Sequence, residues 1–337
     1  MQRALVTGGG GFLGRALASY LQDRGVRVRS LDRVPCPVAG VESVVADLRD
    51  AAAVARACDG VDTVFHTAAM IDWSLNKRAQ LHAVNVEGTE HVLAGCRAAG
   101  VQRLVFTSTV DVVFSGAPIS GGDETLAYPA THLDDYAGTK AEAERRVLAA
   151  NGTDGLRTCA LRVSTLWGPG ERFRIPRFVD MARRGRLMGL GDGTSRFNHL
   201  YITNAAHAHW LAAQSLGDPA SAAAGEAFFI LDGEATNFFA FYSPLLDRIG
   251  LPSRWRYTPA WLVYPFAVIS EAINRRRPDT TEPPLLTRFT VTSTAGDFWF
   301  RSDKARRLLG YTPVVPADRA FDETAAWMRS ALAEAAS

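Results

Sequence analysis

The stretch RALVTGGGGFLG, residues 3–14, decides the fold of this 337-residue chain. An apolar run leads into glycines and then into the helical pattern FLGRALASYLQDRG, which predicts a strand, a tight turn and a helix. Gly8, Gly11 and Gly14 fit the spacing Gly-x-x-Gly-x-x-Gly, and Gly9 fits with Gly11 and Gly14 as Gly-x-Gly-x-x-Gly. Either spacing lets the backbone approach a pyrophosphate at the helix N-terminus. The stretch therefore predicts a phosphate cradle for a dinucleotide.

The acid expected downstream of such a cradle is present. The pattern VRVRSLDR predicts a second strand that ends in Asp32, about 20 residues beyond the glycines. A carboxylate at this place binds the adenosine ribose and repels a 2′-phosphate, so we predict NAD as the cofactor. The neighbouring Arg33 keeps NADP as an alternative.

A second motif lies in DDYAGTKAEAERRVL, residues 134–148, where Lys140 is one of only three lysines among 37 basic residues. The stretch is rich in helix formers, which places Tyr136 and Lys140 one turn apart on one helical face. An ammonium beside a phenol favours the phenolate, whose unperturbed pKa is about 10. We predict that Tyr136 transfers a proton, and that Lys140 lowers its pKa and hydrogen-bonds the ribose of the cofactor.

Short apolar runs alternate with helical patterns, as repeated βαβ units do. The predicted fold is α/β, a Rossmann-type doubly wound parallel sheet with a smaller C-terminal substrate-binding lobe. We place the dinucleotide-binding domain at residues 1–165 and the lobe at 166–337, with some lobe segments returning to the sheet. The predicted strands are residues 4–8, 27–32, 43–47, 63–69, 103–109 and 158–163.

Composition narrows the class of protein. With 47% hydrophobic residues the chain can bury a large core, and its net charge of +2 argues against a nucleic-acid partner. No charged segment followed by an apolar one opens the chain, so we expect a cytoplasmic protein. Scattered cysteines without a Cys-x-x-Cys pair indicate reduced thiols and no metal site; they are Cys36, Cys58, Cys96 and Cys159.

Five motifs in this order resemble an extended short-chain dehydrogenase/reductase. They are the TGxxGFLG turn, NVEGT (85–89), FTSTV (106–110), the Tyr-x-x-x-Lys pair and WGPGE (167–171). Within that superfamily the chain is most similar to the 3β-hydroxysteroid dehydrogenase branch, including the sterol-4-carboxylate 3-dehydrogenases. The likeness extends through KARRLLGYTPVV at residues 304–315.

The resemblance implies roles for individual residues. Thr109, with Ser108 as the second candidate, would hydrogen-bond the reacting oxygen beside Tyr136 and Lys140. Where the family usually has Arg-Pro, this chain has Arg162-Val163, so the resemblance does not settle the contacts on the nicotinamide side. The residues implied to contact the cofactor are Gly8, Gly11, Phe12, Leu13, Gly14, Asp32, Arg33, Asp47, Leu48, Ala68, Ala69, Asn85, Tyr136, Lys140 and Val163. His66 is interpreted as structural.

A rival branch acts on nucleotide sugars, whose pyrophosphate needs fixed cations. In GDGTSRFNHLYITN the first cation position holds Phe197, with Arg196 one place off, and in STAGD the second holds Thr294. The loss of both cations argues for an uncharged, apolar substrate. Side chains in the zones that would line its pocket are Trp73, Trp167, Phe173, Ile175 and Phe178.

We therefore predict an enzyme that reversibly oxidises a secondary 3-hydroxyl on a hydrophobic substrate, a 3β-hydroxysteroid or sterol, with NAD or NADP. Three alternatives remain. One is a 2-alkyl-3-oxoalkanoate (long-chain β-keto acid) reductase, and another is a nucleotide-sugar epimerase or dehydratase. The third is a non-catalytic dinucleotide-sensing protein, which the Tyr-Lys pair disfavours.

The apolar segment at residues 258–278 has two interpretations. Only Glu271 is charged between Ala260 and Ile273, and the run is shorter than the roughly 20 residues of a spanning helix. It is either a helix packed on the core or a lid over the substrate pocket that also rests on a membrane surface. For assembly we expect a homodimer, although no motif fixes the oligomeric state.

Overall fold

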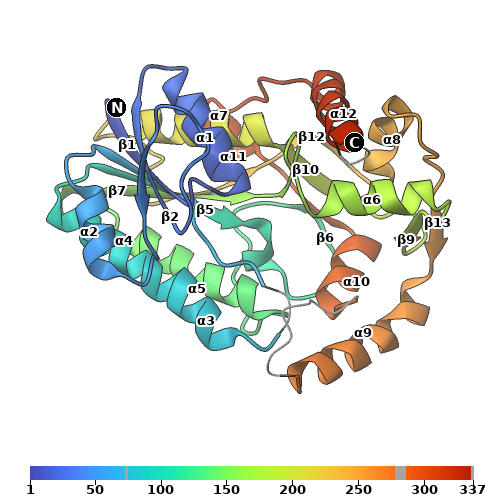
Figure 1. Ribbon diagram of the computed structural model, residues 1–337. Coiled ribbons are helices and arrows are strands. Elements are labelled where there is room, and N and C mark those ends of the chain that lie inside the picture. Colours follow the sequence, from blue (N-terminus) through green and yellow to red (C-terminus); the bar gives the residue numbers. More distant parts are fainter. Residues whose placement is uncertain (73–74, 278–285, 335–337) are drawn as a thin grey trace.

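The computed structural model of the protein describes residues 1–72, 75–277 and 286–334. Its centre is a seven-stranded sheet with the order β11-β7-β5-β4-β1-β2-β3, and every neighbouring pair is parallel (Figure 1). The strands are β1 (Arg3–Thr7), β2 (Arg27–Asp32), β3 (Glu42–Val45), β4 (Thr63–His66), β5 (Arg103–Thr109), β7 (Arg157–Val163) and β11 (Ala227–Ile230). The predicted Rossmann-type parallel sheet is confirmed.

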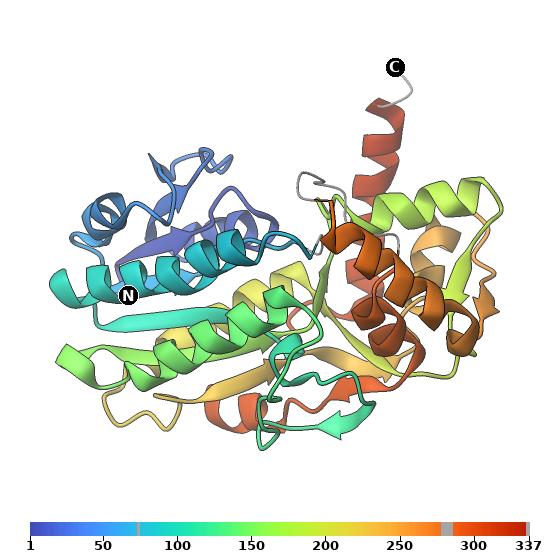
Figure 2. The ribbon, with the colours of Figure 1, turned by 90° about the horizontal axis from the view of Figure 1, so that it is seen from below.

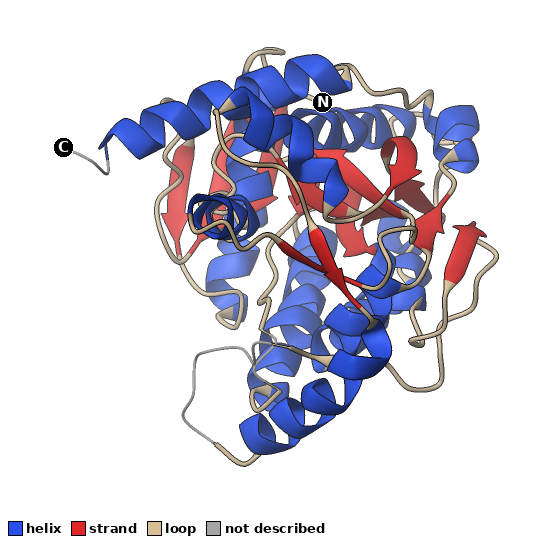
Figure 3. Cartoon of the chain, turned by 90° about the vertical axis from the view of Figure 1, so that its right-hand side faces the viewer, coloured by secondary structure: helices blue, strands red, loops and turns tan. Residues whose placement is uncertain are grey.

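Helices cover both faces of this sheet, as Figure 3 shows from the side. On one face lie α1 (Phe12–Gln22), α7 (Ile202–Ser215) and α11 (Asp303–Leu309). On the other lie α2 (Ala51–Cys58), α4 (Gly88–Ala98) and α5 (Asp135–Ala149), with the short α3 (Arg78–His82) beside α5. The central strands are buried on both sides, which explains their continuous apolar runs.

The C-terminal lobe has its own mixed sheet, with the order β12-β10-β14-β6 and β8 added beside β10. Its strands are β6 (Ile119–Gly122), β8 (Thr165–Trp167), β10 (Phe197–Tyr201), β12 (Asp232–Thr236) and β14 (Phe298–Phe300), and a separate pair joins β9 (Met188–Leu190) to β13 (Arg256–Thr258). Its helices are α6 (Arg174–Arg183), α8 (Ser243–Arg248), α9 (Ala260–Arg275), α10 (Arg288–Ala295) and α12 (Ala317–Glu334). The end of α12 extends away from the body (Figure 2).

The two halves of the sequence exchange elements. Strand β11 and helices α7 and α11 come from the second half and complete the large sheet and its cover, whereas β6 comes from the first half and joins the lobe sheet beside β14. The division at residues 165 and 166 stays a prediction.

Several expected features concern what the chain lacks. All four cysteines are free and buried. In the part of the chain that the structure describes, no three His, Cys, Asp or Glu side chains gather in a way that would hold a metal ion. None of the described helices combines the length and the apolar character needed to cross a bilayer.

Candidate active site

The glycine turn between β1 and α1 is wound so tightly that side chains are excluded. Gly8 has a φ of 77°, and a Cβ there would lie 2.8 Å from the Ala68 Cα. A Cβ on Gly14 would lie 2.0 Å from the Gly8 carbonyl oxygen. Helix α1 begins after Gly11 without a side-chain cap, so its first N–H groups are left for an anion. The turn fits the pyrophosphate of a dinucleotide.

Asp32, at the end of β2, is hydrogen-bonded to the backbone of the glycine turn and of the residue that follows it, Arg33. One carboxylate oxygen of Asp32 accepts the Gly10 N–H at 3.0 Å, and the other accepts the Arg33 N–H at 2.6 Å. Asp32 therefore fixes the loop as well as offering a carboxylate to a ribose. Phe12 and Leu13 form the first turn of α1 and Ala69 follows Ala68 in the loop after β4, so these predicted contacts lie at the same edge.

Asp47 and Leu48, two predicted cofactor contacts, have different hydrogen-bond partners within the protein. A hydrogen bond from Arg49 lowers the pKa of Asp47 to about 2, so its carboxylate is ionised and engaged. Leu48 is buried, and its carbonyl accepts a hydrogen bond from His91 at 2.9 Å. The pair therefore presents an apolar side chain and an anchored backbone beside the dinucleotide edge.

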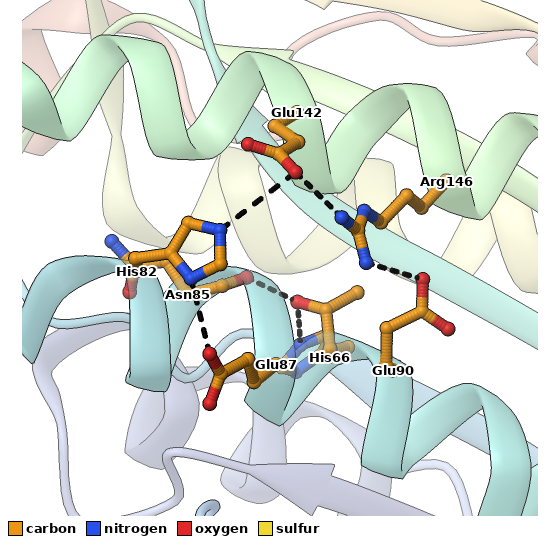
Figure 4. A network of polar contacts seen from close by, with 8 residues as sticks. His66, His82, Asn85, Glu87, Glu90, Glu142 and Arg146 are labelled. Atoms are coloured by element: carbon orange, nitrogen blue, oxygen red, sulfur yellow. Dashed lines mark hydrogen bonds and ion pairs between the residues drawn. The ribbon is translucent and has the colours of Figure 1, made fainter. Parts of the chain in front are cut away.

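Asn85 links the loop after β4 to α5. It is buried in a single π-helical turn, Ala83–Glu87, and its amide bonds both backbone groups of Met70 and the hydroxyl of Thr139. Figure 4 shows Asn85 beside the charged chain formed by His82, Glu87, Glu142, Arg146 and Glu90, which ties α5 to the same region. Asn85 therefore positions the loop and the helix that carry other predicted site residues.

His66 has the structural role expected of it. Its ring bridges the hydroxyls of Thr7 and Thr89 at 2.7 Å and 2.9 Å. Burial, with the nearby charge of Lys140, lowers the pKa of His66 to about 3, so the ring is neutral. It joins β1, β4 and α4 behind the site.

Tyr136 and Lys140 occupy successive turns of α5, as their spacing predicts. Lys140 is buried, and its Nζ donates to the Thr107 carbonyl at 2.7 Å and lies 4.0 Å from the centre of the Phe106 ring. Burial lowers the pKa of Lys140 to about 7. For Tyr136, burial and then the charges of Asp111 and Asp134 raise the pKa. The expected lowering of the Tyr136 pKa is therefore wrong for the protein groups alone, which hold the phenol protonated.

Thr109 ends β5 and is engaged with Asp111. The Thr109 hydroxyl lies 2.8 Å from Asp111 Oδ2 and accepts the Asp111 N–H at 3.2 Å. In the sheet Thr109 is paired with Val163, so these two predicted residues are neighbours. Ser108, the second candidate, has a buried Oγ with no hydrogen-bond partner among the residues that the structure describes. Its hydroxyl does not meet Asp111, which favours Thr109.

Sequence reasoning missed two acids at this site, Asp111 and Asp134. Asp134 caps α5 by accepting the Ala137 N–H at 2.7 Å, and burial raises its pKa to about 6. The signals were present: an acid two residues after Thr109, and an acid at the start of the helix that carries Tyr136. Their burial, which makes them unusual, appears only in the fold.

At the Arg162-Val163 position, Arg162 has a structural role. Arg162 and Glu144 are both buried, and the guanidinium donates to Glu144 Oε1 through Nε at 3.0 Å and Nη2 at 2.7 Å. Tyr128 donates to the same carboxylate oxygen. Arg162 therefore fastens α5 to β7, so it positions the helix of Tyr136 from behind.

The predicted substrate zone divides into core and surface. Phe197 lies in an aromatic cluster with Phe298, and Thr294 is buried with its hydroxyl on the Thr290 carbonyl. Arg196 pairs with Asp297. Trp167, Ile175 and Phe178 are buried in the lobe core, Phe173 is 84% exposed, and Trp73 lies outside the described residues.

Comparison with known proteins places the chain. A model of the 3-beta hydroxysteroid dehydrogenase/isomerase family matches residues 5–258. A 3beta-hydroxysteroid-dehydrogenase/decarboxylase, isoform 2, of Arabidopsis thaliana is 38% identical over 95% of this chain, which spans 61% of that relative's length. A 2-alkyl-3-oxoalkanoate reductase of Stenotrophomonas maltophilia is 41% identical, with 93% of this chain and 95% of the relative covered.

Two further comparisons agree. A 3 beta-hydroxysteroid dehydrogenase/Delta 5-->4-isomerase of Mycobacterium tuberculosis is 40% identical, with 95% of this chain and 89% of the relative covered. Among solved structures, MoeE5 in complex with UDP-glucose and NAD has a TM-score of 0.76 at 26% identity, with 98% and 99% of the two chains covered. The chain therefore belongs to the 3-beta hydroxysteroid dehydrogenase/isomerase family of the extended short-chain dehydrogenases/reductases, NAD(P)-dependent enzymes that act on CH–OH groups.

Proposed function

We propose that this protein interconverts a secondary 3-hydroxyl and a ketone on a hydrophobic substrate, with a 3β-hydroxysteroid or sterol as the first candidate. The observation that carries the proposal is the hydrogen bonding of Thr109 with Asp111 at the carboxyl end of β5, where the helix of Tyr136 packs, on the sheet edge that also carries the dinucleotide turn. In an open parallel sheet, this end of the strands is where ligands bind. The names of the family relatives support a steroid or sterol as the substrate.

The proton and the oxygen are handled by this chain's own residues. In reduction, the protonated Tyr136 donates to the carbonyl oxygen while Thr109 hydrogen-bonds it; in oxidation, Tyr136 takes the hydroxyl proton. Lys140, held on the Thr107 carbonyl one helical turn from Tyr136, would hydrogen-bond the ribose of a bound cofactor. When bound, a nicotinamide cofactor supplies the hydride chemistry.

NAD is the proposed cofactor. The uncapped start of α1 fits the pyrophosphate, and the Asp32 carboxylate at the end of β2 disfavours a 2′-phosphate. Arg33 is exposed beside it, which keeps NADP as the alternative.

A 2-alkyl-3-oxoalkanoate reductase is the second candidate. The pKa of Tyr136 is raised, so the protein groups favour the phenol, which is the form that donates a proton to a ketone. The relative of that name is covered over 95% of its length. A nucleotide-sugar enzyme is less well supported, because Phe197 and Thr294 are buried and Arg196 is held by Asp297.

The test is a turnover screen with NAD(H) and NADP(H) against 3β-hydroxysteroids, long-chain 3-hydroxy and 3-oxo acids, and UDP-sugars. We expect the highest kcat/KM for a steroid or sterol 3-hydroxyl, with the Tyr136→Phe variant as the blank. Higher kcat/KM for a 3-oxo acid would establish the second candidate, and turnover of UDP-sugars alone would refute both. Cofactor binding without turnover of any class would indicate a dinucleotide sensor.

We also propose that α9 rests on a membrane surface from which an apolar substrate enters. Two of its three buried residues, Glu271 and Asn274, are polar, and Glu271 accepts the Arg288 backbone N–H at 2.6 Å and the Arg288 Nε–H at 2.8 Å. Its outer face is apolar, with Trp261 73% and Phe266 65% exposed. The helix lies at the rim of the molecule beside α10 (Figure 1). This polarity is the reverse of that of a helix packed on a core.

Two further features support this placement. Arg275, Arg276 and Arg277 are exposed at the end of α9, where they would meet anionic headgroups. Burial and, to the smallest extent, the charge of Glu271 raise the pKa of Asp134 at the start of α5, so the inner face of α9 is within electrostatic range of that helix.

Vesicle sedimentation tests this placement. The protein should sediment with vesicles that contain anionic lipid, less so at high salt, and the double variant Trp261→Ala/Phe266→Ala should lose most of the binding. The control is Val45→Ala, which alters a 58% exposed apolar residue on β3, at the far edge of the large sheet. Equal sedimentation of the wild type and the double variant would contradict the proposal.

A further inference from the structure

The Thr109 hydroxyl can form only a limited number of hydrogen bonds. A hydroxyl has one proton and two lone pairs. One lone pair of Thr109 Oγ1 accepts the Asp111 N–H at 3.2 Å, and Asp111 Oδ2 lies 2.8 Å from the same oxygen. The protonation state of Asp111 therefore decides what remains for the substrate.

An ionised Asp111 would compete with the reaction. A carboxylate accepts hydrogen bonds only, so Thr109 would give it its single proton. A ketone oxygen has no proton, and the single proton of an alcohol is the one that Tyr136 removes. In both directions the substrate oxygen therefore needs a donor from Thr109, and an ionised Asp111 takes that donor away.

A protonated Asp111 removes the conflict. Its Oδ2–H would donate to the second lone pair of Thr109 Oγ1, and the Thr109 proton would then point to the substrate oxygen. All three sites of the hydroxyl are satisfied in this arrangement. We propose that Asp111 acts as a neutral carboxylic acid that turns the Thr109 hydroxyl toward the substrate oxygen, an inference that rests on the proposed role of Thr109 in catalysis. Asp111 is thus a positioning residue.

The charged and titratable groups around Asp111 agree with a neutral acid. Burial and then the charge of Asp134 raise the pKa of Asp111 to about 7, against the lowering effects of Thr109 and of Arg174 at the start of α6. Helix α5 packs on the turn that carries Asp111, and burial and then the charge of Asp111 raise the pKa of Tyr136 on that helix, so the phenol is neutral. On β7 the guanidinium of Arg162 is bound to Glu144 and so is already engaged elsewhere.

The expected pH dependence has a definite sign. Activity requires the protonated form, so kcat/KM for ketone reduction should fall as pH rises through the Asp111 pKa, about 7. Lys140, whose pKa is also lowered to about 7, titrates in the same window. Asp111→Asn keeps a donor, the amide NH2, but cannot ionise. Above pH 7, kcat/KM should therefore fall more steeply with pH in the wild type than in Asp111→Asn. The two slopes should differ by about a factor of ten in kcat/KM per pH unit.

Three variants make the test decisive. At pH 6, Asp111→Asn should lower kcat/KM only a few-fold, whereas Asp111→Leu, which has no donor, should lower it roughly tenfold or more. Asp123→Asn, which removes an exposed acid paired with Arg301, is the charge control and should leave the profile unchanged. If Asp111 instead worked as an ionised base, Asp111→Asn would cost about 100-fold or more at every pH. That result would overturn the inference. So would a decline of kcat/KM at high pH that has the same slope in the wild type and in Asp111→Asn.

A stability measurement needs no substrate and so separates this inference from the proposed function. The folded-state pKa of Asp111 is raised above its ordinary value of 3.8, so the contribution of Asp111 to the free energy of unfolding should decline as pH rises from about 4 to about 7. Asp111→Asn abolishes that term, so its Tm relative to the wild type should rise over the same window. A constant difference would show that Asp111 ionises normally, and the inference would fall whatever the substrate proves to be.

Discussion

The dinucleotide side and the lobe build their parts of the molecule by different means. The glycine turn is shaped by its backbone. Gly8 and Gly14 admit no side chain, and Asp32 holds the loop through hydrogen bonds with backbone N–H groups. The lobe is shaped by large side chains, and Phe178 packs against Phe239, Tyr242 and Trp255. The first kind of site has a spacing that a sequence displays. The second depends on packing, which no short motif records.

The largest expected effect falls where the two sides meet. Tyr136→Phe removes only the transferable proton, so kcat should fall by about 10³-fold while NAD binding, measured by calorimetry, stays near that of the wild type. The dinucleotide turn and the proton donor would then be separable. Activity within tenfold of the wild type would refute the assignment of Tyr136.

A pair of phenylalanines sharpens the comparison inside the lobe. Phe178 is 6% exposed and Phe266 is 65% exposed. Phe178→Ala should lower the free energy of unfolding by about 3–5 kcal/mol, as for other buried aromatics. Phe266→Ala should change it by less than about 0.5 kcal/mol. Urea denaturation measures both, and a large loss for Phe266→Ala would mean that α9 is packed in solution and would weaken the membrane proposal.

Two helical glycines, Gly14 and Gly138, allow a similar comparison on the dinucleotide side. A Cβ on Gly14 meets the Gly8 carbonyl oxygen at 2.0 Å, whereas a Cβ on Gly138 has no neighbour closer than 3.7 Å. Gly14→Ala should destabilise the fold by at least about 1–3 kcal/mol and weaken NAD binding. Gly138→Ala should raise stability by up to about 1 kcal/mol through helix propensity. Equal Tm values would show that the turn is less crowded than its geometry indicates.

The smallest effect concerns cofactor choice. Asp32→Asn keeps an acceptor for the Gly10 N–H and removes the charge that repels a 2′-phosphate. The ratio of kcat/KM with NADP to that with NAD should rise by about tenfold, with Arg33 then free to meet the phosphate. The control is Glu42→Gln, which alters an acid on β3 that is paired with Arg29 on β2. A wild type that prefers NADP would contradict the assignment of Asp32.

Local patterns carried the prediction of the fold and of most site positions. The six predicted strands all form in the large sheet, and Tyr136 and Lys140 share one helical face, because periodicity and glycine spacing are properties of short segments. The missing seventh strand, β11, is a short apolar run that lies far along the chain, and the sequence prediction did not include it. Its place depends on pairing with β7, which is a tertiary contact.

Charges and burial were harder to predict. The sequence shows that Lys140 stands near Tyr136, but only the fold shows that Lys140 is directed to the Thr107 carbonyl and that two buried acids act on the phenol. In the same way, α9 is apolar over most of its surface, so its sequence does not distinguish an inward from an outward apolar face. The hydrogen bonds of Glu271 to Arg288 decide the orientation.

The placement of β6 beside β14 has a consequence for synthesis of the chain. Ile119 is paired with Phe298, so the ribosome must add about 180 residues after β6 before its partner strand exists. At roughly 5–20 residues per second, that interval is about 10–35 s. The dinucleotide side can assemble on the nascent chain during this time, while the segment that follows Thr109 and Asp111 waits for its partner. The end of β5 that carries Thr109 is therefore among the last parts of the molecule to become complete, and a chain stalled before β14 should be cut by protease near β6.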